Sequence, residues 1–181
     1  MATKTKPTEE VKMHEILVVD ERRCTGCEIC ESVCSMVHDG EFNPLNARIH
    51  RIRLEPIINA TISCVSCFNP SCVSACPLGI ITKNDETGVI KIDYNKCDGC
   101  GACVRFCEYG AITIHTKNKQ AITCDLCEST EFDKPQCVEY CPKGAIFVRE
   151  VDPSQDENRI ITLGKIIKKG FPEPAEGEIL N

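Results

Sequence analysis

The sequence contains no tryptophan, and aromatic residues make up only 5% of its 181 residues. Long apolar stretches are lacking too, since a run such as Ile16 to Val19 is far too short to span a bilayer. The opening residues, MATKTKPTEEVK, hold no apolar core of a secretory signal. We therefore expect a cytoplasmic protein without a transmembrane segment.

The chain also lacks an excess of positive charge. The formal net charge is −6 at pH 7, whereas a protein that binds nucleic acid needs a basic surface to contact the phosphates. The hydrophobic fraction of 42% includes sixteen cysteines, so the aliphatic and aromatic core is modest. A chain of this composition needs a covalent or metal framework to stabilise its fold.

The sixteen cysteines divide into four sets of four without remainder. Sets one and three are spaced C-x2-C-x2-C-x3-C, set two C-x2-C-x4-C-x3-C, and set four C-x2-C-x9-C-x3-C. In chain order the sets are Cys24, Cys27, Cys30 and Cys34; Cys64, Cys67, Cys72 and Cys76; Cys97, Cys100, Cys103 and Cys107; and Cys124, Cys127, Cys137 and Cys141.

Thiols at this spacing indicate iron–sulfur clusters. A cytoplasmic chain keeps its cysteines reduced, which argues against a disulfide framework. Structural zinc uses two separated CxxC pairs, often with histidine, whereas C-x2-C-x2-C places three thiolates at three corners of one cube. In two-cluster ferredoxins the fourth cysteine ligates the other cluster. The sets therefore predict four [4Fe–4S] clusters in two pairs, and a zinc-bound interaction module is the alternative.

The expected fold class is α+β, with short strands and short helices around the clusters. The helices should carry the third and fourth cysteines of each set, because residues four apart share a helix face. A glycine follows sets two, three and four and should end each helix in the left-handed conformation; after Cys34 the chain instead reads SMVHDGEFNPLNARI. Hydrophobic patterns predict strands at 15–20, 47–55, 88–97, 111–116 and 145–151. We expect 111–116 to pair with 88–97, and TKNKQ (116–120) to form a turn.

Several stretches carry a family resemblance. YNKCDGCGACVRFCEYGAI (94–112) resembles a bacterial two-cluster ferredoxin, and 15–150 as a whole resembles the four-cluster electron-transfer subunits of dimethyl sulfoxide reductase, polysulfide reductase and formate dehydrogenase. The opening CTGCEICESVCSMVHDGEFNPLNARI (24–49) is most similar to the short soluble members of that family. Those members accompany tungsten-dependent aldehyde oxidoreductases or, as CooF-type proteins, nickel carbon monoxide dehydrogenases.

The resemblance implies two ferredoxin-like modules nested in sequence. Module A would be 15–58 plus 114–150 with sets one and four, and module B would be 59–113 with sets two and three; 1–14 would be a tail and 151–181 an extension. The implied ligand sets are Cys24, Cys27, Cys30 and Cys141; Cys124, Cys127, Cys137 and Cys34; Cys64, Cys67, Cys72 and Cys107; and Cys97, Cys100, Cys103 and Cys76. Spacing alone leaves the sequential pairing of sets open as well.

The predicted function is electron transfer, because four clusters in a row can conduct electrons and thiolate-saturated irons leave no open position for a substrate. We expect no catalytic residues, and partners consisting of a catalytic oxidoreductase subunit and a further redox protein. By resemblance the first choice of catalytic subunit is a tungsten aldehyde oxidoreductase of an anaerobe. A carbon monoxide dehydrogenase or hydrogenase, or a free-standing polyferredoxin, is the alternative.

Other polar residues are interpreted as structural. The dipeptide His38-Asp39 is interpreted as the polar end of a helix and not as an active site. Positive charge beside cluster ligands would raise cluster potentials, and the candidates are Lys96, Arg105 and Lys143. The remaining histidines are isolated in sequence: His14, His50 and His115. The apolar segment NRIITLGKIIKKG (158–170) is hypothesised to contact another subunit or the next copy of the chain, which would give a filament if the contact does not close.

Overall fold

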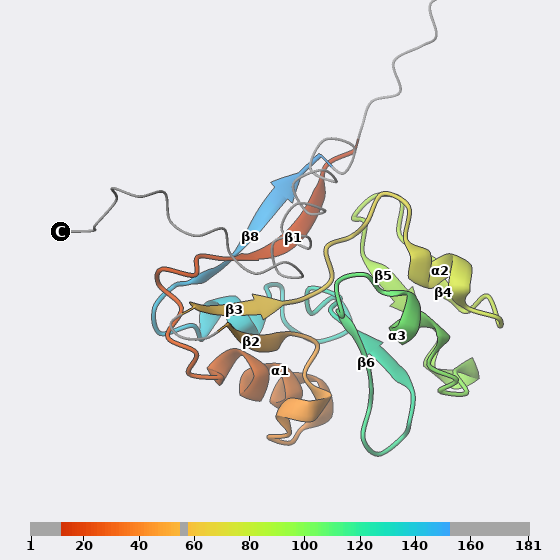
Figure 1. Cartoon of the computed structure of the whole chain (residues 1–181), viewed down its shortest axis with the longest axis horizontal. Coiled ribbons are helices and arrows are strands. Elements are labelled where there is room, and N and C mark those ends of the chain that lie inside the picture. The colour runs from red at the N-terminus through yellow and green to blue at the C-terminus, as the bar shows by residue number, and fades with distance from the viewer. Residues whose placement is uncertain (1–11, 55–57, 153–181) are drawn as a thin grey trace, which may run out of the picture.

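Eight short strands form four separate two-stranded antiparallel sheets in the described part of this computed structural model, residues 12–54 and 58–152 (Figure 1). The strand pairs are β1 (His14–Val19) with β8 (Ile146–Val151), β2 (His50–Leu54) with β3 (Ile58–Ile62), β4 (Ile81–Lys83) with β5 (Ile90–Ile92), and β6 (Ile112–Ile114) with β7 (Ala121–Thr123). The expected α+β class with short elements is confirmed.

The helices pack in pairs. They are α1 (Ile29–Asp39), α2 (Ser71–Ala75), α3 (Ala102–Phe106) and α4 (Gln136–Glu139), with two 3-10 turns, η1 (Pro44–Asn46) and η2 (Tyr94–Lys96). Helix α1 packs against α4, and α2 packs against α3. None of the helices in the described residues has the length and apolarity needed to cross a bilayer.

The placement of the fourth cysteines differs from the prediction for three of the four sets. Only α1 carries both the third and the fourth cysteine of its set, Cys30 and Cys34. Helices α2 and α3 end one residue before Cys76 and Cys107, and α4 ends before Cys141. These three helices have only four or five residues, so a helix face of i and i+4 exists in set one alone.

The glycines after sets two, three and four are left-handed but do not end the helices. Gly79, Gly110 and Gly144 have φ of 61°, 65° and 53°. Each glycine donates its N–H to the carbonyl of the preceding fourth cysteine, as in Gly79 to Cys76 at 3.2 Å. The glycine therefore closes a turn that lies beyond the helix and leads into the next strand.

The expected pairing of 111–116 with 88–97 is wrong. Strand β6 pairs with β7, with Ile112 opposite Thr123 and Ile114 opposite Ala121. The polar turn predicted at 116–120 is the loop of this hairpin, so the local partner across a short loop prevails over the distant one.

Two buried clusters divide the molecule into two halves. We call them outer and inner by their place in the sequence: the outer half is formed by elements from both ends of the described chain and the inner half by elements from its middle. The outer half contains β1, α1, β2, β3, α4 and β8, and its core is built around Leu17, Ala47, Ile49 and Ile146. The inner half contains α2, β4, β5, α3, β6 and β7, and its core is built around Ile81, Ile90, Ile92, Ile112 and Ala121. In Figure 1 the outer half lies on the left and the inner half on the right.

The module boundaries expected at 58/59 and 113/114 fall inside strands β3 and β6. Because β6 and β7 both pack into the inner core, we propose to assign the whole β6–β7 hairpin to the inner half. The predictions for 1–11 and for 153–181, including the apolar segment 158–170, lie outside the described residues.

Candidate metal centres

Three cysteines of set one face the last cysteine of set four around a hollow of about 380 Å³, named site I here. The lining thiols are Cys24, Cys27, Cys30 and Cys141. The loop curls back through the left-handed residues Gly26 (φ 69°) and Glu28 (φ 62°). A Cβ on Gly26 would lie 2.5 Å from Asn59 Oδ1, so the Asn59 side chain would have to move, and the left-handed backbone at Gly26 itself favours glycine.

The fourth cysteine of set one lies in a different hollow, site II, of about 280 Å³. Its lining thiols are Cys34, Cys124, Cys127 and Cys137. Leu126 and Cys127 are left-handed, with φ of 56° and 66°. For non-glycine residues this conformation is uncommon, and here it turns the chain so that both Cys124 and Cys127 reach one space.

Set three and the last cysteine of set two line a third hollow, site IV, of about 320 Å³. Its thiols are Cys76, Cys97, Cys100 and Cys103. Glycines flank Cys100 on both sides, and both Gly99 and Gly101 are left-handed. A Cβ on Gly99 would lie 2.1 Å from the carbonyl oxygen of Lys119, so this loop is packed directly onto the β6–β7 turn.

The remaining four cysteines are also neighbours and form site III: Cys64, Cys67, Cys72 and Cys107. Burial, together with the charges of Cys64 and Cys107, raises the pKa of Cys67 to about 11 and that of Cys72 to about 12. Lys83 acts in the opposite direction on Cys67, and its Nζ donates to the Cys67 carbonyl at 2.6 Å. The sequence analysis considered other cations and missed Lys83, which is 16 residues from Cys67 in the chain.

Backbone N–H groups point at several of the sulfurs. The N–H of Ala145 donates to Cys141 Sγ at 3.3 Å, and the N–H of Ala111 donates to Cys107 Sγ at 3.3 Å. Burial would raise the pKa of Cys76, but the backbone N–H groups that follow it outweigh this effect and lower the pKa. Such donors stabilise thiolate, the form that binds metal.

For several of the other thiols, burial is the largest influence on the pKa. Burial raises the pKa of Cys30 to about 12, and raises those of Cys124 and Cys137 as well. Crowded thiols of this kind cannot all ionise unless a metal replaces their protons. Within the described residues, no three His, Cys, Asp or Glu side chains are gathered as ligands of a single metal ion. The hollows of sites I, II and IV are each lined by four thiols, which is the donor set of a cube of iron and sulfide.

The four sites follow one another through the molecule. Cys30 of site I is near Cys137 of site II, and Cys64 of site III is near Cys124 of site II. Helices α2 and α3, which carry Cys72 of site III and Cys103 of site IV, pack together. Among all sixteen cysteines, only Cys27 and Cys100 are exposed. These two belong to the first and the last site of this order.

A buried charge network beside site II escaped the sequence analysis. Arg48 Nη1 donates to Asp125 Oδ2 at 2.8 Å, and His38 Nε2 lies 3.2 Å from Asp125 Oδ1. His38 Nδ1 lies 2.8 Å from the Cys34 carbonyl. Both ring nitrogens face acceptors, so both carry protons and His38 is an imidazolium. Asp125 lies between Cys124 and Cys127 in sequence, but its partners are 77 and 87 residues away, and spacing does not reveal them.

The pKa values agree with this assignment. Burial lowers the pKa of His38, but the interactions with Asp125 and Cys34 together outweigh burial and raise the pKa to about 9. Burial would raise the pKa of Asp125, yet His38 and Arg48 hold it well below its usual range.

The prediction that His38-Asp39 ends a helix is confirmed. Of the cations expected beside ligands, Lys143 lines site I, whereas Lys96 pairs with Asp93 at 2.7 Å.

Comparison with known proteins extends this picture. Residues 57–151 match the model of the 4Fe-4S dicluster domain family. The chain is 35% identical to the polyferredoxin-like subunit of an aliphatic sulfonate oxidoreductase of Pyrococcus furiosus, over 74% of this chain and 75% of that protein. It is 31% identical to the putative electron transport protein YsaA of Escherichia coli, over 79% and 94%.

Further relatives share the electron-transfer description. The chain is 29% identical to the thiosulfate reductase electron transfer subunit PhsB of Salmonella typhi, over 77% of this chain and 78% of that one. Among solved structures, a chain of the active site complex BamBC of benzoyl coenzyme A reductase aligns with a TM-score of 0.47, 22% identity, and 88% and 93% coverage. The sequence matches are sufficient to conclude that this protein belongs to the 4Fe-4S dicluster domain family.

Proposed function

We propose that this protein is an iron–sulfur electron-transfer subunit of an oxidoreductase complex and holds four [4Fe–4S] clusters. The observation that carries the proposal is the composition of the hollows. In sites I, II and IV, three cysteines of one set meet the fourth cysteine of another. This exchange of the fourth ligand is the arrangement of two-cluster ferredoxins.

The proposed ligands are the nested sets. They are Cys24, Cys27, Cys30 and Cys141 at site I; Cys34, Cys124, Cys127 and Cys137 at site II; Cys64, Cys67, Cys72 and Cys107 at site III; and Cys76, Cys97, Cys100 and Cys103 at site IV. Each bound cluster supplies a one-electron acceptor and donor. The protein's own residues bury the inner thiols, aim N–H groups at sulfur and leave Cys27 and Cys100 exposed.

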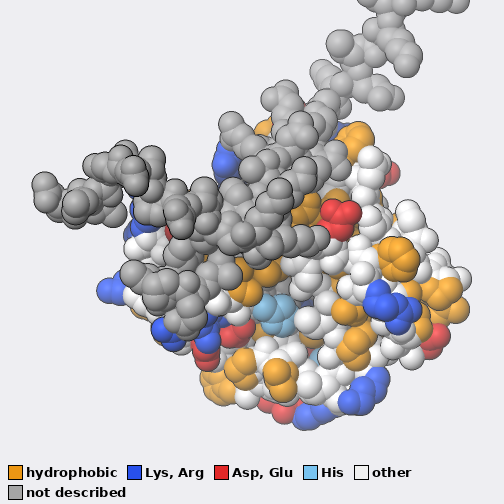
Figure 2. All heavy atoms as spheres, in the orientation of Figure 1, with side chains coloured by type: hydrophobic (Ala, Val, Ile, Leu, Met, Phe, Trp, Pro, Cys, Tyr) orange, Lys and Arg blue, Asp and Glu red, His pale blue; other side chains and the backbone are white. Residues whose placement is uncertain are grey.

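The two exposed cysteines indicate where redox partners would dock. An electron partner must approach a cluster closely, and the exposed thiols lie at the two ends of the order of sites. We propose that one partner docks over site I and the other over site IV. On the face shown in Figure 2, acidic and basic side chains are interspersed with hydrophobic ones, which suits a docked redox protein better than a polyanion.

The catalytic partner is proposed by analogy. Two relatives of this chain are named as subunits of a sulfonate oxidoreductase and of a thiosulfate reductase. The proposed class of partner is therefore a catalytic oxidoreductase subunit. A tungsten aldehyde oxidoreductase remains our first choice, carbon monoxide dehydrogenase the second, and a free-standing polyferredoxin the third. The proposed location is the cytoplasm, and association through 158–170 stays a hypothesis about residues that the structure does not describe.

Anaerobic metal analysis tests the proposal. We expect about sixteen iron and about sixteen acid-labile sulfide per chain, four of each for every cube. Zinc at a comparable level with no sulfide would overturn the proposal in favour of an interaction module. Purification from the native source then identifies the catalytic subunit that elutes with the chain, and elution alone as a loaded monomer would support the free polyferredoxin.

The nested pairing has a separate test. If sets one and four share clusters, Cys34→Ser and Cys137→Ser should alter the same electron paramagnetic resonance (EPR) signal of the reduced protein, because both residues line site II. Cys72→Ser should alter a different signal. If Cys34→Ser and Cys72→Ser instead alter one signal in common, the pairing is sequential and the proposed ligand sets are wrong.

A further inference from the structure

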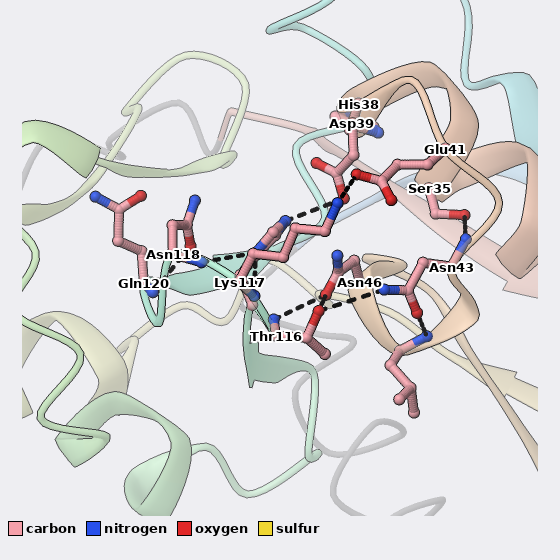
Figure 3. A network of polar contacts seen from close by, with 12 residues as sticks. Ser35, His38, Asp39, Glu41, Asn43, Asn46, Thr116, Lys117, Asn118 and Gln120 are labelled. Carbon is pink, nitrogen blue, oxygen red and sulfur yellow. Dashed lines mark hydrogen bonds and ion pairs between the residues drawn. The ribbon is translucent and has the colours of Figure 1, made fainter.

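The end of α1 and the segment that follows it contact the β6–β7 hairpin of the inner half (Figure 3). Asp39, Glu41, Asn43 and Asn46 lie on one side, and His115, Thr116 and Lys117 on the other. We propose that these contacts form a junction clamp that sets the separation between sites II and III. The inference rests on the proposed function, and it assigns a positioning role to Asn46 and His115 that no ligand pattern reveals.

Asn46 is the buried centre of the clamp, with 1% of its surface exposed. Its Oδ1 accepts hydrogen bonds from the Thr116 N–H at 2.9 Å and from the Thr116 hydroxyl at 2.8 Å. The same hydroxyl accepts from Asn43 Nδ2 at 3.3 Å. Asn46 Nδ2 is buried without a partner, a costly arrangement that the double contact through Oδ1 offsets.

His115 fixes the other side of the clamp and is also buried. Its Nδ1 accepts from the N–H groups of Lys117 at 3.1 Å and Asn118 at 3.3 Å. Because Nδ1 accepts, the ring proton is on Nε2, which lies 3.2 Å from Asp39 Oδ2 and donates to it. One imidazole therefore holds the hairpin turn with one nitrogen and the outer half with the other. An exposed ion pair between Lys117 and Glu41 lies at the rim.

The hairpin connects this clamp to the sulfurs. Strand β7 begins with Ala121, whose N–H points at Cys97 Sγ of site IV at 3.5 Å. The strand ends at Thr123, whose hydroxyl donates to the Ala111 carbonyl at 3.2 Å, and the Ala111 N–H points at Cys107 Sγ of site III at 3.3 Å. The residue after Thr123 is Cys124 of site II. A shift of the hairpin would therefore move three sites relative to one another. Electron exchange between clusters falls steeply with distance, so a small shift matters.

The clamp also accounts for the longer connection that follows set one, which differs from the short glycine turns that follow the other sets. In sets two, three and four a glycine turn leads directly into a strand. In set one, α1 runs on to Asp39, and Gly40 (φ 72°), η1 and Asn46 follow before β2. The added residues supply every outer-half partner of the hairpin named above, and none of the sixteen cysteines.

A matched pair of substitutions separates the clamp from the stability of the hairpin. Asparagine places its amide oxygen where Nδ1 of histidine lies, and glutamine places its amide nitrogen near Nε2. His115→Asn thus keeps the turn acceptor and loses the bond to Asp39, whereas His115→Gln keeps the donor to Asp39 and loses the turn acceptor. Asn46→Ala is a second way to open the clamp. Asn84→Ala is the control, since Asn84 Oδ1 accepts from Glu86 and Thr87 in the β4–β5 turn of the inner half alone.

The readouts are iron content, the magnetic interaction between reduced clusters in the EPR spectrum, and the rate at which an injected electron equilibrates between clusters. We expect full iron content in every variant, with weakened magnetic interaction and slower equilibration in His115→Asn and Asn46→Ala. His115→Gln and Asn84→Ala should match the unmodified protein in both. The reverse order of the two His115 variants, or wild-type behaviour of His115→Asn and Asn46→Ala at full iron content, would overturn the inference. Absence of clusters from the unmodified protein would instead overturn the proposed function, and the inference with it.

Discussion

Cys30 and Cys34 lie one helical turn apart on α1, yet they line different hollows. Cys30 is at site I with Cys141, and Cys34 is at site II with Cys137. The helix therefore runs between two candidate clusters and fixes their separation through its own backbone, so changes to its residues should affect two clusters at once.

Paired substitutions test this arrangement by counting iron. The double variant Cys30→Ser/Cys34→Ser removes one ligand from each of two sites, and we expect it to lose up to about eight iron atoms. Cys27→Ser/Cys30→Ser removes two ligands from one site, and should lose about four. Iron and sulfide analysis of the anaerobically purified proteins measures the difference. Equal losses in the two double variants would contradict the division of α1 between two sites.

Two glycines beside Cys100 should respond differently to the same change. Gly99 and Gly101 have nearly the same φ, 71° and 72°, but a Cβ meets Lys119 at Gly99 and open space at Gly101. Gly101→Ala should cost about 1 kcal/mol for the left-handed conformation alone, and Gly99→Ala about 3 kcal/mol or more because the β6–β7 turn must move as well. The temperature at which cluster absorbance is lost reports both. Similar midpoint temperatures for the two variants would show that the loop at Gly99 is not packed against the β6–β7 turn.

The charge of His38 should tune one cluster. Replacement by glutamine in His38→Gln removes a positive charge next to site II while keeping a hydrogen-bond donor. Since positive charge favours the reduced cluster, we expect the reduction potential of one cluster to fall and the other three to stay unchanged. An EPR-monitored redox titration measures this. Lys96→Gln is the control, because that exposed ammonium is paired with Asp93, and an equal shift in the control would contradict a specific effect of His38.

Removal of iron should unfold both halves. The two cores are built around the cysteines themselves, which occupy positions among the buried aliphatic residues. Without the clusters, the space between the cysteines in both cores is left unfilled. The cysteines then remain neutral thiols because their pKa values are raised, and thiols alone cannot fill that space. Circular dichroism during anaerobic chelation should show loss of secondary structure together with cluster absorbance. A folded, colourless protein would contradict this account.

His14 should make the protein sensitive to acid. Burial lowers its pKa below the ordinary 6.5, and the charge of Lys83 adds to the effect. Because the folded pKa is below the unfolded one, the unfolded chain binds more protons as pH falls through 6.5, and the free energy of unfolding decreases on the acid side.

His14→Leu removes this titrating group. The rate of cluster loss in chelator should increase less in the variant than in the unmodified protein between about pH 7.5 and about pH 5.5. An identical acid dependence in both proteins would assign the effect to other groups, such as His50, whose pKa is also lowered by burial.

The sequence allowed the cysteine sets and most strands to be predicted, because both depend on local spacing. Strands β2, β5, β6 and β8 lie within the expected ranges, and β1 begins one residue before its expected range. The pairing of 111–116 was missed because an apolar alternating pattern identifies a strand without identifying its partner. Helix lengths were also missed, since the turn closed by Gly79, Gly110 or Gly144 takes up residues that a simple helix would use.

Contacts across long separations in sequence were beyond reach. His115 and Asp39 are 76 residues apart, as are Lys117 and Glu41. Neither pair carries a motif, and a buried histidine is often only a packed residue. Arg48 and Asp125 were hidden for the same reason, although the position of Asp125 between Cys124 and Cys127 was a signal that could have been followed.

The pairing of β1 with β8 has a consequence for biosynthesis. Strand β1 leaves the ribosome early and has no partner in the sheet until residue 151 has been translated, while sets two and three are complete by Cys107. The middle of the chain can thus bind metal while β1 is still unpaired. Cluster insertion would then proceed from the centre of the chain outward to its ends.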